Sequence, residues 1–278
     1  MVAYIVDLFN YEFFRNILIV SIILSFLLPL VGIIINLKKI AFLPDTIGQI
    51  NMAGVAFGSL LVSIFSFQII PNFLMVVIFT IIGSLLIEIL GSKFKNYNEI
   101  SLMVVHSLSI MLVMFFLSFN NSYNNSIFSI LFGNINSISH QDLIITIFLA
   151  IFVVIIFFFF YKKILIVILE KNHAEIYGLN ERRISCLTTC IISIVICIAI
   201  KIVGIFLVGT LITIPILIAS TFVKSLKKAI LVSMLITLYS FLSGITISIF
   251  FDLPTSAVIT LNVLLLYFLS LMMKGKKW

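Results

Sequence analysis

The chain has 278 residues, of which 63% are hydrophobic and 10% are charged, and its mean hydropathy is +1.34. A water-soluble domain cannot cover that much apolar surface, so the composition excludes this class and predicts a chain that lives in a lipid bilayer. The formal charge of +7 would also suit binding to nucleic acid, but membrane sidedness explains the basic residues, and we expect no nucleic-acid partner.

Long apolar stretches follow one another along the chain. A helix needs about 20 mostly apolar residues to cross the hydrocarbon core. We therefore expect an all-α, polytopic transmembrane bundle with eight to nine spans, in one domain over residues 1–278. The first stretch is expected to be a retained span, because it is long and lacks a small-residue cleavage site. The stretches are 14–36, 52–70, 73–92, 100–119, 143–161, 184–200, 204–222, 229–251 and 255–273.

The basic residues mark one side of the membrane. With the N-terminus outside and nine crossings, all of the 17 Lys and Arg residues except Arg15 and Lys201 fall on the cytoplasmic side. Adding or removing one crossing before the C-terminus destroys this pattern. The charges therefore favour nine spans, with the N-terminus outside and the C-terminus inside.

A polar segment, residues 44–51, separates the first two apolar stretches and contains Asp45 and Gln49. A charged group at the bilayer centre costs roughly 2.5–3.5 kcal/mol on insertion scales, so a carboxylate kept here suggests a permeation path. Spacing by four residues puts Asp45 and Gln49 on one helical face. The alternative is that Asp45 caps a helix outside the hydrocarbon.

Other polar groups within the apolar stretches have simpler explanations. Glu88 is expected to reach the inner interface or to pair with a nearby lysine, and a pathway carboxylate is the alternative. Cys186, Cys190 and Cys197 share one helical face and could hold a soft metal. We expect them instead to pack as small hydrophobic side chains.

Two loops are long enough to carry short helices but too short to form a soluble domain. The outer loop, about 120–142, predicts a re-entrant or surface helix that leads into the fifth stretch. The inner loop, about 162–183, turns from apolar to polar and has a plausible helix stop at Gly178. Such a surface helix can transmit force from a soluble partner, and an ordinary solvated loop is the alternative.

Glycines and one proline indicate close packing and bending. Small residues let membrane helices approach each other, and Pro215 should free the carbonyl of Leu211 and bend its helix. The residues assigned to packing and bending are Gly54, Gly58, Gly204, Gly209 and Pro215.

Landmarks along nearly the whole chain resemble the membrane permease of bacterial zinc, manganese and iron ABC importers. Each block is weak alone, but their order and spacing are specific. The blocks are Lys38-Lys39 before Asp45, residues 54–58 (GVAFG), 131–134 (LFGN), 174–178 (AEIYG), 203–219 from Val-Gly to Pro, 251–254 (FDLP), and His106 in a Val-His-Ser triplet.

The resemblance implies a permease subunit that imports zinc, manganese or iron through the cytoplasmic membrane of a bacterium, without a permanently bound cofactor. It also implies cytosolic ATPase subunits, an extracytoplasmic metal-binding protein and a second permease chain as partners. The sequence has no Gly-x-x-x-x-Gly-Lys-Ser/Thr phosphate loop, so ATP hydrolysis is expected in the separate subunits. A permease for a metal chelate or another small nutrient is the alternative, and an intramembrane enzyme is a more remote one.

The resemblance also assigns roles to individual residues, with one departure from the family pattern. The family has His four residues after the Asp, whereas this chain has Gln49, and an amide oxygen is a weaker and harder ligand than imidazole. The metal pathway is predicted to comprise Asp45, Gln49 and His106, and His106 could alternatively join helices. Coupling to the ATPase is assigned to Glu170, Ala174, Glu175 and Gly178. His140, Asp142 and Asp252 are expected on the outer side, where they contact the delivery protein or the entering ion, or form a solvated rim.

Overall fold

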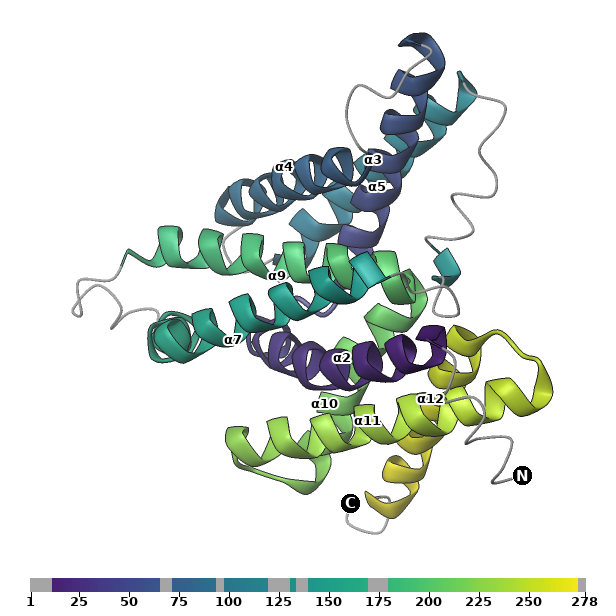
Figure 1. Cartoon of the computed structure of the whole chain (residues 1–278). Coiled ribbons are helices and arrows are strands. Elements are labelled where there is room, and N and C mark those ends of the chain that lie inside the picture. The colour runs from purple at the N-terminus through teal and green to yellow at the C-terminus, as the bar shows by residue number, and fades with distance from the viewer. Residues whose placement is uncertain are drawn as a thin grey trace. The chain divides into compact units, whose positions relative to one another are not determined.

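The computed structural model describes residues 12–65, 72–93, 98–119, 131–133, 140–169 and 180–274. The elements of this part are α-helices connected by short segments (Figure 1). They are α2 (Glu12–Leu37), α3 (Leu43–Phe65), α4 (Asn72–Lys93), α5 (Asn98–Ser118), α7 (His140–Leu169), α9 (Glu181–Val203), α10 (Ile205–Phe222), α11 (Leu226–Phe251) and α12 (Thr255–Lys274).

Eight of the described helices are long and apolar enough to cross a membrane. Helix α7 is bent by 63° between Leu143–Phe157 and Phe159–Ile168. If these two parts together make one crossing, the number of spans is nine. These helices confirm an all-helical membrane fold with eight to nine spans. The sidedness derived from the basic residues stays a prediction.

The second span begins earlier than the sequence suggested. Helix α3 starts at Leu43 and ends at Phe65, whereas the apolar stretch was placed at 52–70. Pro44 and Asp45 fit within the first helical turn because Pro needs no intrahelical donor there and a carboxylate is stabilised at the positive end of the helix dipole. The polar segment is therefore part of the helix itself.

Contacts divide the chain into two compact units. Unit 1 comprises Met1–Asn36, Phe132–Phe152 and Lys201–Trp278, and unit 2 comprises Leu37–Leu131 and Val153–Ile200. Helices α10, α11 and α12 pack together in unit 1, and α3 packs against α4 and α5 in unit 2. The expectation of a single domain over 1–278 stays a prediction.

Glycines permit the closest helix contacts inside unit 1. A Cβ atom added to Gly32 in α2 would lie 2.1 Å from the backbone oxygen of Ile212 in α10. Gly133 has a φ of +72°, and a Cβ there would lie 2.2 Å from the backbone carbon of Val203. Val203 ends α9, and Gly204, with a φ of 90°, separates it from α10. A side chain at position 133 would therefore meet the backbone of the α9–α10 junction in a strained conformation.

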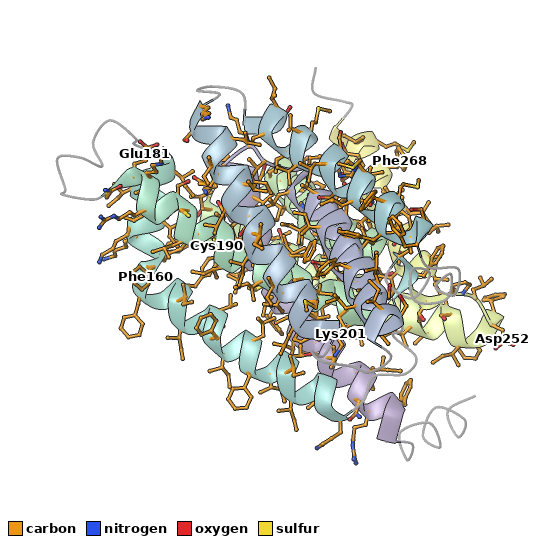
Figure 2. All side chains as sticks on the ribbon, turned by 90° about the horizontal axis from the view of Figure 1, so that it is seen from above. Phe160, Glu181, Cys190, Lys201, Asp252 and Phe268 are labelled. Atoms are coloured by element: carbon orange, nitrogen blue, oxygen red, sulfur yellow. The ribbon has the colours of Figure 1, made fainter. Side chains whose placement is uncertain are left out.

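Large apolar side chains cover much of the exposed surface of the described helices. Phe148, Met114 and Phe159 are 72%, 69% and 70% exposed, and Figure 2 shows Phe160 projecting away from its helix. Many Ser and Thr hydroxyls donate to backbone carbonyls three or four residues earlier, as Ser109 does to Val105 at 2.8 Å. Hydroxyl groups that are hydrogen-bonded within their own helix, together with apolar side chains on the outer surface, suit a hydrocarbon environment.

Candidate functional site

The first two turns of α3 present Asp45 and Gln49 on one face. Both side chains are half-buried, whereas Leu43, Thr46 and Ile47 beside them are completely buried. Asp45 lies in the first turn, where backbone N–H groups have no intrahelical acceptor and favour a negative charge. The buried neighbours fix the helix, so that the carboxylate and the amide are held one turn apart on its more accessible side.

Helix α5 brings His106 to the beginning of α3. The His106 ring lies 4.9 Å from the ring of Phe42, measured between centroids, and the imidazole is close enough to Asp45 for a coulombic interaction. Its Nδ1 atom is buried and has no hydrogen-bond partner among the described residues. A buried nitrogen left without a partner costs about 1–3 kcal/mol, so this position is suited to an additional ligand or a water molecule.

The three residues predicted for the metal pathway, Asp45, Gln49 and His106, offer one carboxylate, one amide and one imidazole. Across the described part of the chain, no three His, Cys, Asp or Glu side chains are grouped so as to hold a metal ion. Structural zinc sites use four such ligands. The role of Asp45, Gln49 and His106 in a metal pathway stays a prediction.

Helices α4 and α9 meet along a seam of polar side chains in unit 2. Ser84 donates to the Sγ of Cys190 at 3.3 Å, and the Oγ1 of Thr189 donates to the Oε2 of Glu88 at 2.8 Å. Near the start of α9, Arg182 donates to Ser92 at 3.5 Å. The pairs advance along α4 while they go back along α9, so the two helices are antiparallel.

The α4–α9 seam contains residues that our sequence analysis did not select. Thr189 and Ser185 were overlooked, and Lys38 served only as a landmark before Asp45. The sequence does contain a pattern that indicates this seam. A polar side chain recurs every four residues along the otherwise apolar α4, at Thr80, Ser84, Glu88 and Ser92. The structure records a hydrogen bond from the hydroxyl of Thr189 to Glu88, and a pairing of Glu88 with a nearby lysine stays a prediction.

The cysteines lie on α9, where Figure 2 labels Cys190 and also Glu181 at the first residue of the helix. Among the described residues none of the three forms a disulfide, and Cys197 is buried whereas Cys186 and Cys190 are half-buried. Cys190 accepts the Ser84 hydrogen bond. These contacts fit thiols that pack between helices.

The residues assigned to ATPase coupling, Glu170, Ala174, Glu175 and Gly178, lie outside the described residues. On one side, α7 continues beyond the predicted end of its span to Leu169. On the other side, the side chain of Asn180 accepts a hydrogen bond from the backbone N–H of Arg183 at 3.2 Å. This is an N-cap, and it explains why α9 begins at Glu181 and not at the predicted residue 184.

The outer-side residues have separate positions in the fold. His140 is the first residue of α7 and is exposed, and the side chain of Asp142 lies outside the described residues. Asp252 ends α11 in the left-handed conformation, with a φ of 51°, and is exposed at the connection to α12 (Figure 2). Short polar residues such as Asp adopt this conformation more readily than most. Asp252 therefore has a place in the turn itself, and contact with a delivery protein stays a prediction.

The residues assigned to packing and bending are described individually. A Cβ on Gly54 would lie 2.9 Å from the Cα of Val76 in α4, and Gly58 is buried one turn later. Gly204 is the N-cap of α10. The carbonyl of Gly209 accepts a hydrogen bond from Thr213 at 2.8 Å, and that of Pro215, which is buried in α10, accepts one from Ser233 at 3.3 Å. The Ser233 hydroxyl has a nearer acceptor in its own helix, the carbonyl of Ala229 at 2.7 Å, so its contact with Pro215 is the weaker of the two.

Known proteins similar to this chain are membrane components of metal transport systems. A probable metal transport system membrane protein of Treponema pallidum is 31% identical over 232 residues, which cover 82% of this chain and 84% of that protein. A manganese transport system membrane protein of Listeria innocua, MntC, is 26% identical over 97% of this chain and 94% of the relative.

The fold is also found in a solved structure. PsaBC from Streptococcus pneumoniae, determined in complex with Fab, has a chain that matches with a TM-score of 0.80 and 22% identity, over 97% of this chain and 95% of that chain. The family described as the ABC 3 transport family matches residues 10–274. With this match over almost its entire length, the chain belongs to the ABC 3 transport family.

Proposed function

We propose that this chain is the permease subunit of an ATP-driven importer that moves zinc, manganese or iron across the cytoplasmic membrane of a bacterium. Family membership and the transport systems named for its relatives support this function. The single observation that carries it at residue level is the packing of α5 on α3, which brings His106 within electrostatic range of Asp45 and leaves its buried Nδ1 without a hydrogen-bond partner among the described residues.

Each side chain of the proposed site contributes differently to the passage of a cation. The carboxylate of Asp45 supplies the negative charge and an oxygen ligand suited to manganese, and the imidazole of His106 supplies a nitrogen ligand suited to zinc and iron. Gln49 offers a neutral oxygen one turn after Asp45. Because this amide binds more weakly than the family imidazole, the site should favour release over tight retention.

The proposal assigns ATP hydrolysis to cytosolic subunits that contact residues 162–183, including Glu170, Ala174, Glu175 and Gly178. An extracytoplasmic protein delivers the metal, for which His140, Asp142 and Asp252 are the proposed outer contacts. A second copy of this chain completes the path. The metal is cargo, and no resident cofactor is part of the proposal.

A copurification experiment tests the subunit assignment. When the chain is affinity-purified in mild detergent from its native cells, we expect a protein with a nucleotide-binding phosphate loop to accompany it, identified by mass spectrometry. A matched purification with an unrelated multi-span protein controls for nonspecific membrane carry-over. Metal transport by the isolated chain without any ATPase would contradict the assignment.

Replacing Gln49 tests its role as a weak ligand. Gln49→His places an imidazole one turn from Asp45, and we expect the KM for zinc to fall about tenfold, with a smaller change for manganese, because zinc prefers nitrogen ligands more strongly. The measurement is initial uptake of each metal by cells at graded concentrations. An unchanged ratio of the two KM values would mean that position 49 does not face the metal.

Uptake measurements in the same cells distinguish a free metal ion from a metal chelate as the cargo. Gln49 weakens the site for a bare ion and thereby favours a metal chelate as the second candidate. Uptake that requires an organic chelator, and that is unchanged by substitution of His106, would support the chelate. Uptake of the free metal that falls in His106→Ala would support the ion.

A further inference from the structure

Lys38 joins the turn after α2 to helix α9 within unit 2. Its Nζ atom donates to the Oγ of Ser185 at 2.9 Å, to the Oγ1 of Thr189 at 2.9 Å and to the backbone oxygen of Ser185 at 3.2 Å. An ammonium group has three protons, and these three acceptors match them. All three distances are within the usual range for hydrogen bonds, so Lys38 is held in a defined place on α9.

Thr189 connects Lys38 to an opposite charge on a third segment. Its hydroxyl accepts from Lys38 and donates to the Oε2 of Glu88 at 2.8 Å, although the carbonyl of Ser185 lies at 3.0 Å as a second acceptor. Only one proton is available, and the carboxylate is both nearer and charged. Thr189 is 1% exposed, so the central hydroxyl of this relay is shielded from water, whereas Lys38 and Glu88 at its ends are half-buried. The α2–α3 turn, α9 and α4 are thus linked by charge-assisted hydrogen bonds.

Lys38 lies only a few residues before the start of α3, so its contact with α9 is close to Asp45 along the chain. The backbone N–H of Leu43 donates to the oxygen of Ile40 at 3.0 Å, and both of these side chains are buried. This turn passes directly into the first turn of α3, which contains Asp45. At the other end, Ser185 lies near the start of α9, the helix that follows the proposed coupling loop. A displacement of α9 therefore acts on the beginning of α3 through one side chain.

We propose that Lys38 is a positioning residue that transmits movement of α9 to Asp45 and so couples ATP hydrolysis to the metal site. This inference rests on the proposed function and adds a specific mechanical link to it. Glu88 balances the charge of Lys38, and Thr189 orients the two groups. Lys39, the adjacent exposed lysine, has no part in the link and provides the matched control.

Reconstitution of the complete complex tests the link. The complex of the chain with its ATPase and metal-delivery protein is placed in liposomes, and both ATP hydrolysis and metal uptake are measured with and without metal. In Lys38→Met the number of ions transported per ATP should fall about tenfold, whereas Lys39→Met should match the wild type. Lys38→Arg should restore part of the ratio, because a guanidinium can also donate to both hydroxyls.

The outcomes separate the link from a general effect of charge or folding. Wild-type coupling in Lys38→Met, or an equal loss in Lys38→Met and Lys39→Met, would overturn the inference. If Lys38→Met does not assemble, Thr189→Val decides: it keeps the side-chain shape, and it should lose coupling if the relay is correct and retain it if not. A wild-type complex that shows no metal-stimulated hydrolysis would contradict the proposed function as well as the link.

Discussion

Asp45→Asn should lower metal uptake about 100-fold while the protein is still produced and assembled. Two unit charges at 4 Å attract each other by about 4 kcal/mol at an effective dielectric constant of about 20. Half-burial of Asp45 allows solvent to screen part of this energy, and about 2.7 kcal/mol suffices for a 100-fold change. The amide keeps the size of the side chain but removes the charge that attracts the cation.

The measurement is uptake of zinc, manganese and iron by cells that contain equal amounts of the variant and wild-type complexes. Glu99→Gln is the matched control, since Glu99 is an exposed acidic residue in the first turn of α5. It should leave uptake close to the wild-type value. Equal uptake of all three metals by Asp45→Asn and the wild type would remove Asp45 from the pathway.

Gly32→Ala should destabilise the protein more than Gly83→Ala, which adds the same methyl group to a different helix. The new Cβ would lie 2.1 Å from the backbone oxygen of Ile212 and 2.7 Å from the Cδ1 of Ile216, so α2 and α10 must move apart. Overpacking of this kind costs about 1–3 kcal/mol or more and exceeds the roughly 1 kcal/mol gained from better helix propensity. A net loss of about 2 kcal/mol should lower the midpoint of thermal unfolding in detergent by about 4–8 °C.

Gly83→Ala provides the comparison, because it introduces the same methyl group into another helix. There the nearest atom is the Cδ1 of Ile50 at 2.4 Å, the end of a side chain that can rotate away. Its unfolding midpoint should remain within about 3 °C of the wild type. A Gly32→Ala protein as stable as Gly83→Ala would show that α2 and α10 do not approach as closely as the structure indicates.

The class of fold was predictable from the sequence because a chain that crosses lipid must hydrogen-bond its backbone polar groups internally, as an α-helix does. Nine apolar stretches of spanning length therefore predict a bundle of helices. Helix boundaries were less predictable where polar residues belong to a span. Helix α3 begins at Leu43 because proline and aspartate fit a first turn, and an apolar window cannot recognise this. The N-cap at Asn180 likewise extends α9 beyond its apolar part.

The members of the candidate site could be proposed from the sequence, but their geometry could not. The spacing of Asp45 and Gln49 placed both on one face, because it depends only on helical periodicity. Whether His106 approaches them depends on the packing of α5 against α3, which no local pattern specifies, and the structure brings His106 within electrostatic range of Asp45. The contacts of Lys38 with Ser185 and Thr189 span 147 and 151 positions in the chain and are determined by tertiary packing alone.

ATP-dependent metal uptake by a reconstituted complex tests the central claim most directly. Liposomes containing this chain and its cytosolic ATPase are supplied with the metal-loaded delivery protein outside, ATP at the ATPase side, and radioactive zinc, manganese or iron. Our account predicts that at least one of these metals accumulates on the ATPase side with ATP and not with a non-hydrolysable analogue. Hydrolysis of ATP by the assembled complex without accumulation of any of the three metals would contradict it.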